Sequence, residues 1–219
     1  MKNTLFDKDN VSIKRELNSQ LGRAGKIAIN WLKHSPIYIS TKTTGTGKFA
    51  QLIEIAILDC DQSVMYHSQI KPTVAIDDDA LEQHSIDLSS LSDRPSWPQV
   101  AATIQALIKE RRIIMFDVLF ETRILKQSCI AHGLEFDWID DLNIDCAMNL
   151  ATITYGIDNR YGTTSIDYAM KKANITGYKA DTGAVAATYA VIQLIRIIAD
   201  YTHKLQTQAE KKPQKHVSL

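Results

Sequence analysis

Residues 39–49 read ISTKTTGTGKF, and the apolar run QLIEIAIL follows at residues 51–58. The glycine-rich centre of this stretch is similar to a phosphate-binding loop, which requires the pattern G-x-x-x-x-G-K-[ST]. Counting back from Gly47-Lys48, the first glycine position is held by Lys42, and the residue after the motif is phenylalanine. The following run is rich in β-branched residues, which favours a strand where a phosphate loop would enter a helix. The stretch therefore predicts two strands joined by a Thr-Gly turn.

The pattern around these strands predicts one mixed α/β domain. Residues 1–35 carry apolar positions at helical spacing and are predicted to form an amphipathic helical extension that packs on its own domain or on a partner. The domain itself is predicted to span residues 36–202, and residues 203–219 to form a basic, flexible tail. The expected strands are residues 37–41, 51–58, 63–70 and 112–116, and the expected helices are residues 98–110, 118–132, 145–155, 164–173 and 181–201.

Composition narrows the classes of function. The 219 residues are 45% hydrophobic and 23% charged, with 25 basic and 25 acidic residues, so any attraction to nucleic acid must come from a local patch. The three cysteines form no C-x-x-C pair, which is typical of a reduced, cytoplasmic protein without disulfides or zinc. The longest apolar run, residues 184–199, contains Gln193 and Arg196 and is too short to predict a membrane span.

Four segments, in order, resemble the motifs of the DEDDh (DnaQ-like) 3′–5′ exonucleases. Residues 40–45 and 52–56, STKTTG and LIEIA, are similar to D-x-E-T-T-G and I-x-E-I-A, and residues 71–86 are similar to the K-P…A…I-H-G-I segment. Residues 116–125, FDVLFETRIL, resemble H/Y-N-x-x-F-D-x-x-x-L, and residues 178–184, YKADTGA, resemble H-x-A-L-x-D-A. The resemblance implies an RNase H-like fold, with a central mixed β-sheet flanked by helices.

The resemblance also implies which positions would carry the chemistry. Members of that family use four carboxylates to hold two divalent metal ions and a histidine to handle the attacking water. Here Ser40 and Lys42 stand at the first-motif acids, Glu121 at the second, Gly183 at the third and Tyr178 at the histidine. Magnesium needs several oxygen ligands, and a cation about 4 Å from another unit charge costs about 4 kcal/mol at an effective dielectric constant near 20. We therefore expect no catalytic residues and no metal cofactor at this degenerate site.

Other residues near the motifs have simpler interpretations than metal binding. Asp117 precedes a helix and is expected to be its N-cap. Asp181 favours the positive end of the last helix, and the aspartates at residues 77–79 are expected to lie in a solvated turn. Lys42 is expected to pair with Glu121 in place of a metal cluster, and a contact between Lys42 and a nucleic-acid phosphate is the second hypothesis.

Two classes of function remain open from the sequence. The first is a catalytically inactive pseudo-exonuclease that binds single-stranded DNA or RNA, or a protein partner. The second is an active 3′–5′ exonuclease with an atypical Mg²⁺ or Mn²⁺ site built around Glu121. A homodimer is left open and a membrane partner is not expected. The nucleic-acid contacts of the first hypothesis would be Lys42, Thr43, Thr44, Gly45 and Lys48.

Overall fold

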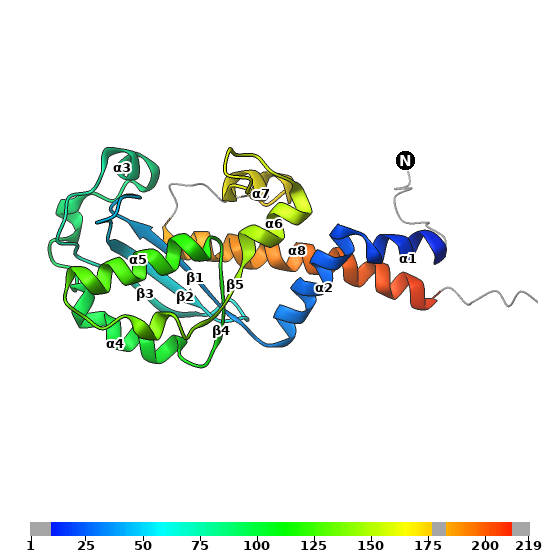
Figure 1. Ribbon diagram of the computed structural model, residues 1–219, viewed down its shortest axis with the longest axis horizontal. Helices are drawn as coiled ribbons and strands as arrows, with labels where there is room; N and C mark the ends of the chain where they lie inside the picture. The colour runs from blue at the N-terminus through cyan, green and yellow to red at the C-terminus, as the bar shows by residue number, and fades with distance from the viewer. Residues whose placement is uncertain (1–9, 177–182, 212–219) are drawn as a thin grey trace, which may run out of the picture.

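The computed structural model describes residues 10–176 and 183–211, which form a five-stranded sheet with helices on both faces (Figure 1). The sheet has the strand order β3-β2-β1-β4-β5. The elements are α1 (Asn10–Asn18), α2 (Gln20–Lys33), β1 (Ile37–Thr43), β2 (Leu52–Leu58), β3 (Val64–Gln69), α3 (Asp78–His84), α4 (Trp97–Ile108), β4 (Arg112–Met115), α5 (Val118–Ala131), β5 (Asn143–Cys146), α6 (Ala147–Tyr155), α7 (Ile166–Lys172) and α8 (Ala184–Lys211), with short 3-10 turns at Leu88–Leu91 and Asp137–Ile139.

The sheet is mixed, as the sequence predicts. Strand β1 pairs antiparallel with β2 and parallel with β4, while β3 extends the antiparallel side and β5 the parallel side. Because β1 and β4 are parallel, their carboxyl ends meet at one edge of the sheet, and the residues that follow them lie close together. This edge positions the site described below.

Alternating side chains of the central strands enter two hydrophobic cores. Tyr38 of β1 and Ala56 of β2 face α2, α6 and α8, whereas Ile39 and Ile55 face α4 and α5. Every residue of β2 is buried, which explains its nearly continuous apolar sequence, because a strand covered on both faces needs no polar side. Glu54, which is also buried, is the one polar residue in this otherwise apolar strand.

The predicted N-terminal extension is helical but is interrupted. Its described part consists of α1 and α2, separated at Ser19, whose hydroxyl accepts a hydrogen bond from the Gly22 N–H at 3.1 Å and so caps the second helix. The apolar face of α2 packs against α8 and α6, so the packing of this helix on its own domain is confirmed.

The last helix, α8, is longer than the sequence pattern indicates. It runs to Lys211, well past the predicted domain boundary at residue 202, because Leu205 is buried and α1 lies along its second half (Figure 1). The Tyr201 hydroxyl bonds to Glu16 Oε1 at 2.7 Å across this contact. An 18-residue window within Ala184–Glu210 has a mean hydropathy of 1.4, so this helix is long and apolar enough to span a membrane, but 56% of that window is buried inside the protein. Packing against the sheet and α2 accounts for that composition.

One strand, β5, was not predicted from the sequence. The expected helix at residues 145–155 begins only at Ala147, because Asn143–Cys146 pairs with β4 as strand β5. This strand has four residues, and none of them is fully buried. Its pairing with β4 supplies the stabilisation that its own apolar pattern does not indicate.

Candidate functional site

A cleft of about 520 Å³ opens at the carboxyl end of β1. We call it the β1–α5 cleft. Its walls are residues 40–46, helix α3 with the residue before it, residues 116–121 at the start of α5, and residues 159–166 before and at the start of α7. Figure 1 shows α3 and α7 on the same side of the molecule, above the end of the sheet. The cleft brings together three of the predicted site positions, Ser40, Lys42 and Glu121.

The three positions do not face one another directly. Because side chains alternate along a strand, Ser40 and Lys42 share the face of β1 that carries Tyr38 and lies toward α8, while Thr41 shares the face of Ile39 and lies toward α5. The first-motif and second-motif positions therefore approach the end of β1 from opposite faces of the sheet.

Glu121 is held by Thr41. The Thr41 hydroxyl donates to Glu121 Oε2 at 2.7 Å, and the glutamate is buried. Burial raises the pKa of this carboxyl to about 7, an effect that the Thr41 hydrogen bond opposes, that the charge of Asp117 adds to, and that Lys42 opposes to a smaller degree. The expected pairing of Glu121 with Lys42 is thus a secondary influence, and the hydrogen-bond partner is one that the sequence analysis did not name.

Gly183, at the third-motif position, lies beside a different carboxylate. Glu54 of β2 accepts the Ala184 N–H at 2.9 Å through Oε2, and its Oε1 lies 2.7 Å from Nε2 of His67. A Cβ atom placed on Gly183 would lie 3.0 Å from Glu54 Oε1. A buried carboxylate at a helix N-terminus is stabilised by the free N–H groups there. Glu54 therefore occupies the space next to the position where an aspartate side chain would begin.

Sequence analysis overlooked Glu54 as a site residue. Its Cα is paired with that of Lys42 across the β1–β2 ladder, so both side chains leave the sheet on the α8 side. The signal that could have found it is an acidic residue inside the otherwise apolar strand Leu52–Leu58. Tyr178 and Asp181 lie outside the described residues.

Both threonine hydroxyls of the Thr43-Thr44-Gly45 turn form hydrogen bonds with nearby backbone groups. The Thr43 hydroxyl donates to the Gly45 carbonyl at 2.8 Å, and the Thr44 hydroxyl accepts the Gln51 N–H at 2.9 Å. A Cβ on Gly45 would collide with the carboxylate of Asp77, so the turn requires glycine because another side chain lies against its backbone. This arrangement fixes the shape of the cleft floor.

Two further cleft residues have structural roles, of which that of Asp117 was predicted from the sequence. Asp117 is the N-cap of α5 and accepts the Phe120 N–H at 3.2 Å. His84 accepts the Ile86 N–H through Nδ1 at 3.1 Å, which leaves Nε2 to donate to the Thr43 carbonyl at 3.1 Å. Burial lowers the pKa of His84, and the ring is therefore neutral at pH 7.

The residues at the metal-ligand positions do not fit a pair of divalent ions. Within residues 10–176 and 183–211, no group of three or more His, Cys, Asp or Glu side chains is arranged to hold a metal. The donors at the matched positions are one hydroxyl, one ammonium and one carboxyl group with a pKa near 7. Such a set offers little negative charge to a hard cation.

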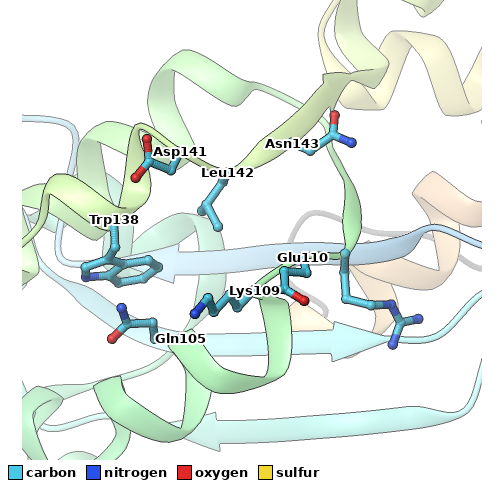
Figure 2. Close-up of a pocket in the computed structure, with 8 residues that line it drawn as sticks. Gln105, Lys109, Glu110, Trp138, Asp141, Leu142 and Asn143 are labelled. Atoms are coloured by element: carbon cyan, nitrogen blue, oxygen red, sulfur yellow. The ribbon is translucent and has the colours of Figure 1, made fainter.

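A second hollow, of about 370 Å³, lies at the other edge of the sheet. It is formed where α4 ends and where β4 and β5 begin. Figure 2 shows the side chains of Trp138, Gln105 and Lys109 around it. None of the predicted site residues lines this hollow, so the chemistry suggested by the motifs belongs to the β1–α5 cleft.

Comparison with curated proteins finds two partial relatives, and no protein-family model matches the chain. "Uncharacterized exonuclease CP81" of Escherichia phage 186 is 30% identical over 110 residues, which is 50% of this chain and 57% of the relative. "Uncharacterized protein pSLT049" of Salmonella typhimurium is 31% identical over 67 residues, which is 31% of this chain and 49% of the relative. The chain thus matches about half the length of these relatives.

Solved structures of exonucleases share the fold. The nuclease domain of 3′hExo, a DEDDh family member bound to rAMP, superposes with a TM-score of 0.56 at 11% identity, covering 75% of this chain and 91% of that domain. Exonuclease X in complex with 5′ overhanging duplex DNA gives 0.51 at 19%, covering 76% and 98%. E. coli Exonuclease I in complex with a dA16 oligonucleotide gives 0.57 at 18%, covering 78% and 45%. The chain therefore has the RNase H-like fold of the DEDDh exonucleases, and the resemblance identified in the sequence is confirmed at the level of the fold.

Proposed function

We propose that this protein binds single-stranded nucleic acid in the β1–α5 cleft without hydrolysing it. The observation that carries the proposal is the state of Glu121, the one acid at the matched positions. Its carboxylate is buried, bonded to Thr41 and has a pKa raised to about 7. A group in that state is a poor ligand for Mg²⁺, and Lys42 places positive charge where a second acid would be needed.

The fold supports nucleic-acid binding, the function that remains if the protein does not hydrolyse its ligand. The structures of related fold are described in complexes with rAMP, with duplex DNA carrying a 5′ overhang, and with dA16. In this chain Lys48 is exposed and Lys42 is partly exposed, on either side of the Thr43-Thr44-Gly45 turn. Cations in such positions attract phosphates, with an affinity that falls as salt is raised.

The competing function is hydrolysis at an atypical metal site, which is favoured by the similarity to a phage protein named as an exonuclease. Incubation of a 5′-fluorescein single-stranded oligonucleotide with the protein in Mg²⁺ or Mn²⁺ separates the two. We expect no shortening on a denaturing gel. Shortening that Glu121→Gln abolishes would overturn the proposal, since that variant keeps the size of the side chain and removes its charge.

Binding is measured with the same oligonucleotide by fluorescence anisotropy at low salt. We expect affinity in the micromolar range, weakened by Lys42→Glu. The exposed Lys26 of α2, far from the cleft, provides the matched control Lys26→Glu, which changes the net charge equally. Equal weakening by both variants would mean that the cleft is not the binding site, and no binding at all would direct the search to a protein partner.

A further inference from the structure

Three aromatic side chains around the β1–α5 cleft each lie beside a cation. Phe49 and Tyr161 are 70% and 75% exposed, so their rings are accessible to a ligand. The pairs are Lys48 with Phe49 (Nζ to ring centroid 4.8 Å), Arg123 with Phe120 (Cζ to centroid 5.3 Å) and Arg160 with Tyr161 (Cζ to centroid 5.0 Å).

Contacts join the three pairs into one surface. Phe120 on α5 and Tyr161 in the loop before α7 both line the cleft. Arg123 donates through Nη1 to the Thr46 carbonyl at 3.1 Å, and Gln127 donates through Nε2 to the Lys48 carbonyl at 2.8 Å. The turn that carries Lys48 and Phe49 is therefore fastened along the exposed side of α5. We call this surface, defined by the three cation–aromatic pairs, the cleft rim.

Among the described residues, the charged side chains that line the cleft are mostly acidic. Asp77, Asp79 and Asp117 line it together with Glu121, and Lys42 is the one lysine in this lining. The Asp77 carboxylate also lies against Gly45, so it occupies space directly above the turn. Without a bound cation, the carboxylates of Asp77, Asp79 and Asp117 repel a phosphate, while the arginines and lysine of the rim attract one.

We propose that the cleft rim binds the interior of a single-stranded nucleic acid and needs no free 3′ end. Bases stack on the exposed rings of Tyr161 and Phe49 and against the part of Phe120 that lines the cleft, and the adjacent cations meet the phosphates between them. Stacking on aromatic rings does not depend on the nucleotide sequence, because every base has a flat face. It requires unpaired bases, which a single strand provides. The inference rests on the nucleic-acid binding proposed above and specifies its ligand.

The first test compares three forms of one fluorescent oligothymidylate at low salt in EDTA: linear with a free 3′ hydroxyl, linear with a 3′ phosphate, and covalently closed into a circle. If the strand binds at the cleft rim, the three dissociation constants should lie within about twofold of one another. Each stacked base contributes to the affinity whether or not the strand ends nearby. Binding of the free 3′ end alone would overturn the inference and leave the proposed function standing. Failure of all three forms to bind would overturn the proposed function itself.

The second test places the strand on the rim. Tyr161→Ala is expected to weaken binding about tenfold, from the loss of one stacking platform, whereas Tyr161→Phe retains the ring and stays within about twofold of wild type. Because Tyr161 is exposed, neither change should disturb folding, which circular dichroism checks. Equal affinities for the alanine and phenylalanine variants would contradict stacking at this position.

The cations of the rim are tested through salt dependence. Arg160→Ala should reduce the slope of log K against log salt by about 0.7, the effect of one phosphate contact on a single strand. Lys172 forms a similar pair with Tyr168 on α7, but Tyr168 does not line the cleft, whereas Tyr161, the partner of Arg160, does. Lys172→Ala is therefore the matched control and should leave the slope unchanged. A smaller slope for the control variant and not for Arg160→Ala would place the strand elsewhere.

Discussion

The carboxyl group of Glu121 shows how the surroundings of one side chain change its protonation. It is enclosed between β1 and α5, with the Thr41 hydroxyl as its hydrogen-bond partner and the charge of Asp117 nearby. Burial and the negative neighbour both favour the neutral acid, and a single hydrogen bond does not compensate for them. The same group in a cluster of cations would remain ionised.

This raised pKa makes stability depend on pH in a defined direction. The unfolded chain releases the proton near the ordinary value of 4.5 and the folded protein near 7. Between these values the folded state binds more protons than the unfolded state, so the free energy of unfolding decreases as pH rises, by up to about 3 kcal/mol. Urea denaturation at about pH 5 and about pH 8 should show this loss in wild type and not in Glu121→Gln. The exposed Glu82 supplies the control Glu82→Gln, which should behave as wild type.

At the start of α8, the position expected to carry an aspartate holds Gly183. The carboxylate that lies there belongs to Glu54 of β2. We predict that Gly183→Asp destabilises the protein by about 1 to 2 kcal/mol more than Gly183→Asn, because only the aspartate sets a second negative charge beside Glu54. The measurement is the free energy of unfolding in urea. Glu54→Gln in the Gly183→Asp background should recover most of the difference. Equal stability of the two Gly183 variants would show that the charge of Glu54 does not interact with a charge at this position.

At the scale of elements, the close crossing of α2 and α8 holds the N-terminal helices to the domain. A Cβ on Gly25 would collide with the Thr202 hydroxyl and would lie 3.0 Å from the Ile198 carbonyl. The two helices therefore lie close together at Gly25, where there is no room for a side chain.

We predict that Gly25→Ala lowers the free energy of unfolding by about 1 to 3 kcal/mol, as overpacking does elsewhere. Thr202→Ala in the same background removes the colliding hydroxyl and should restore part of the loss. Gly47 lies in the turn after β1, where an added Cβ would meet no other atom within 4 Å, so Gly47→Ala is the control and should be neutral. If both alanine variants are neutral, the helices can separate without cost.

At the scale of the whole molecule, the cleft lies where the carboxyl ends of two parallel strands meet, the place where open α/β sheets commonly bind ligands. We predict that neither Mg²⁺ nor Mn²⁺ raises the thermal unfolding midpoint. A ligand that binds only the folded state stabilises it by mass action, and the matched positions offer a divalent ion a single carboxyl group, that of Glu121. Differential scanning calorimetry with and without each ion provides the measurement. An increase in Tm that disappears in Glu121→Gln would show a metal site built on that residue.

Much of the fold was readable from local patterns. The apolar runs of β1 and β2, the N-cap at Asp117 and the start of α5 all follow from residues close in sequence. The short strand Asn143–Cys146 and the extension of α8 to Lys211 were missed, because each depends on a distant partner, β4 in one case and α1 in the other.

The order of motifs along the chain was sufficient to establish the type of fold and to show that acids are missing from the matched positions, because residue identity and spacing are properties of the sequence. The pairing of Glu121 with Thr41, the capping of α8 by Glu54 and the gathering of three cation–aromatic pairs at one cleft were decided by tertiary contacts. These contacts join residues up to 130 positions apart. Burial and neighbouring charge, which set the protonation of a carboxyl and the exposure of a ring, arise only when those segments pack together.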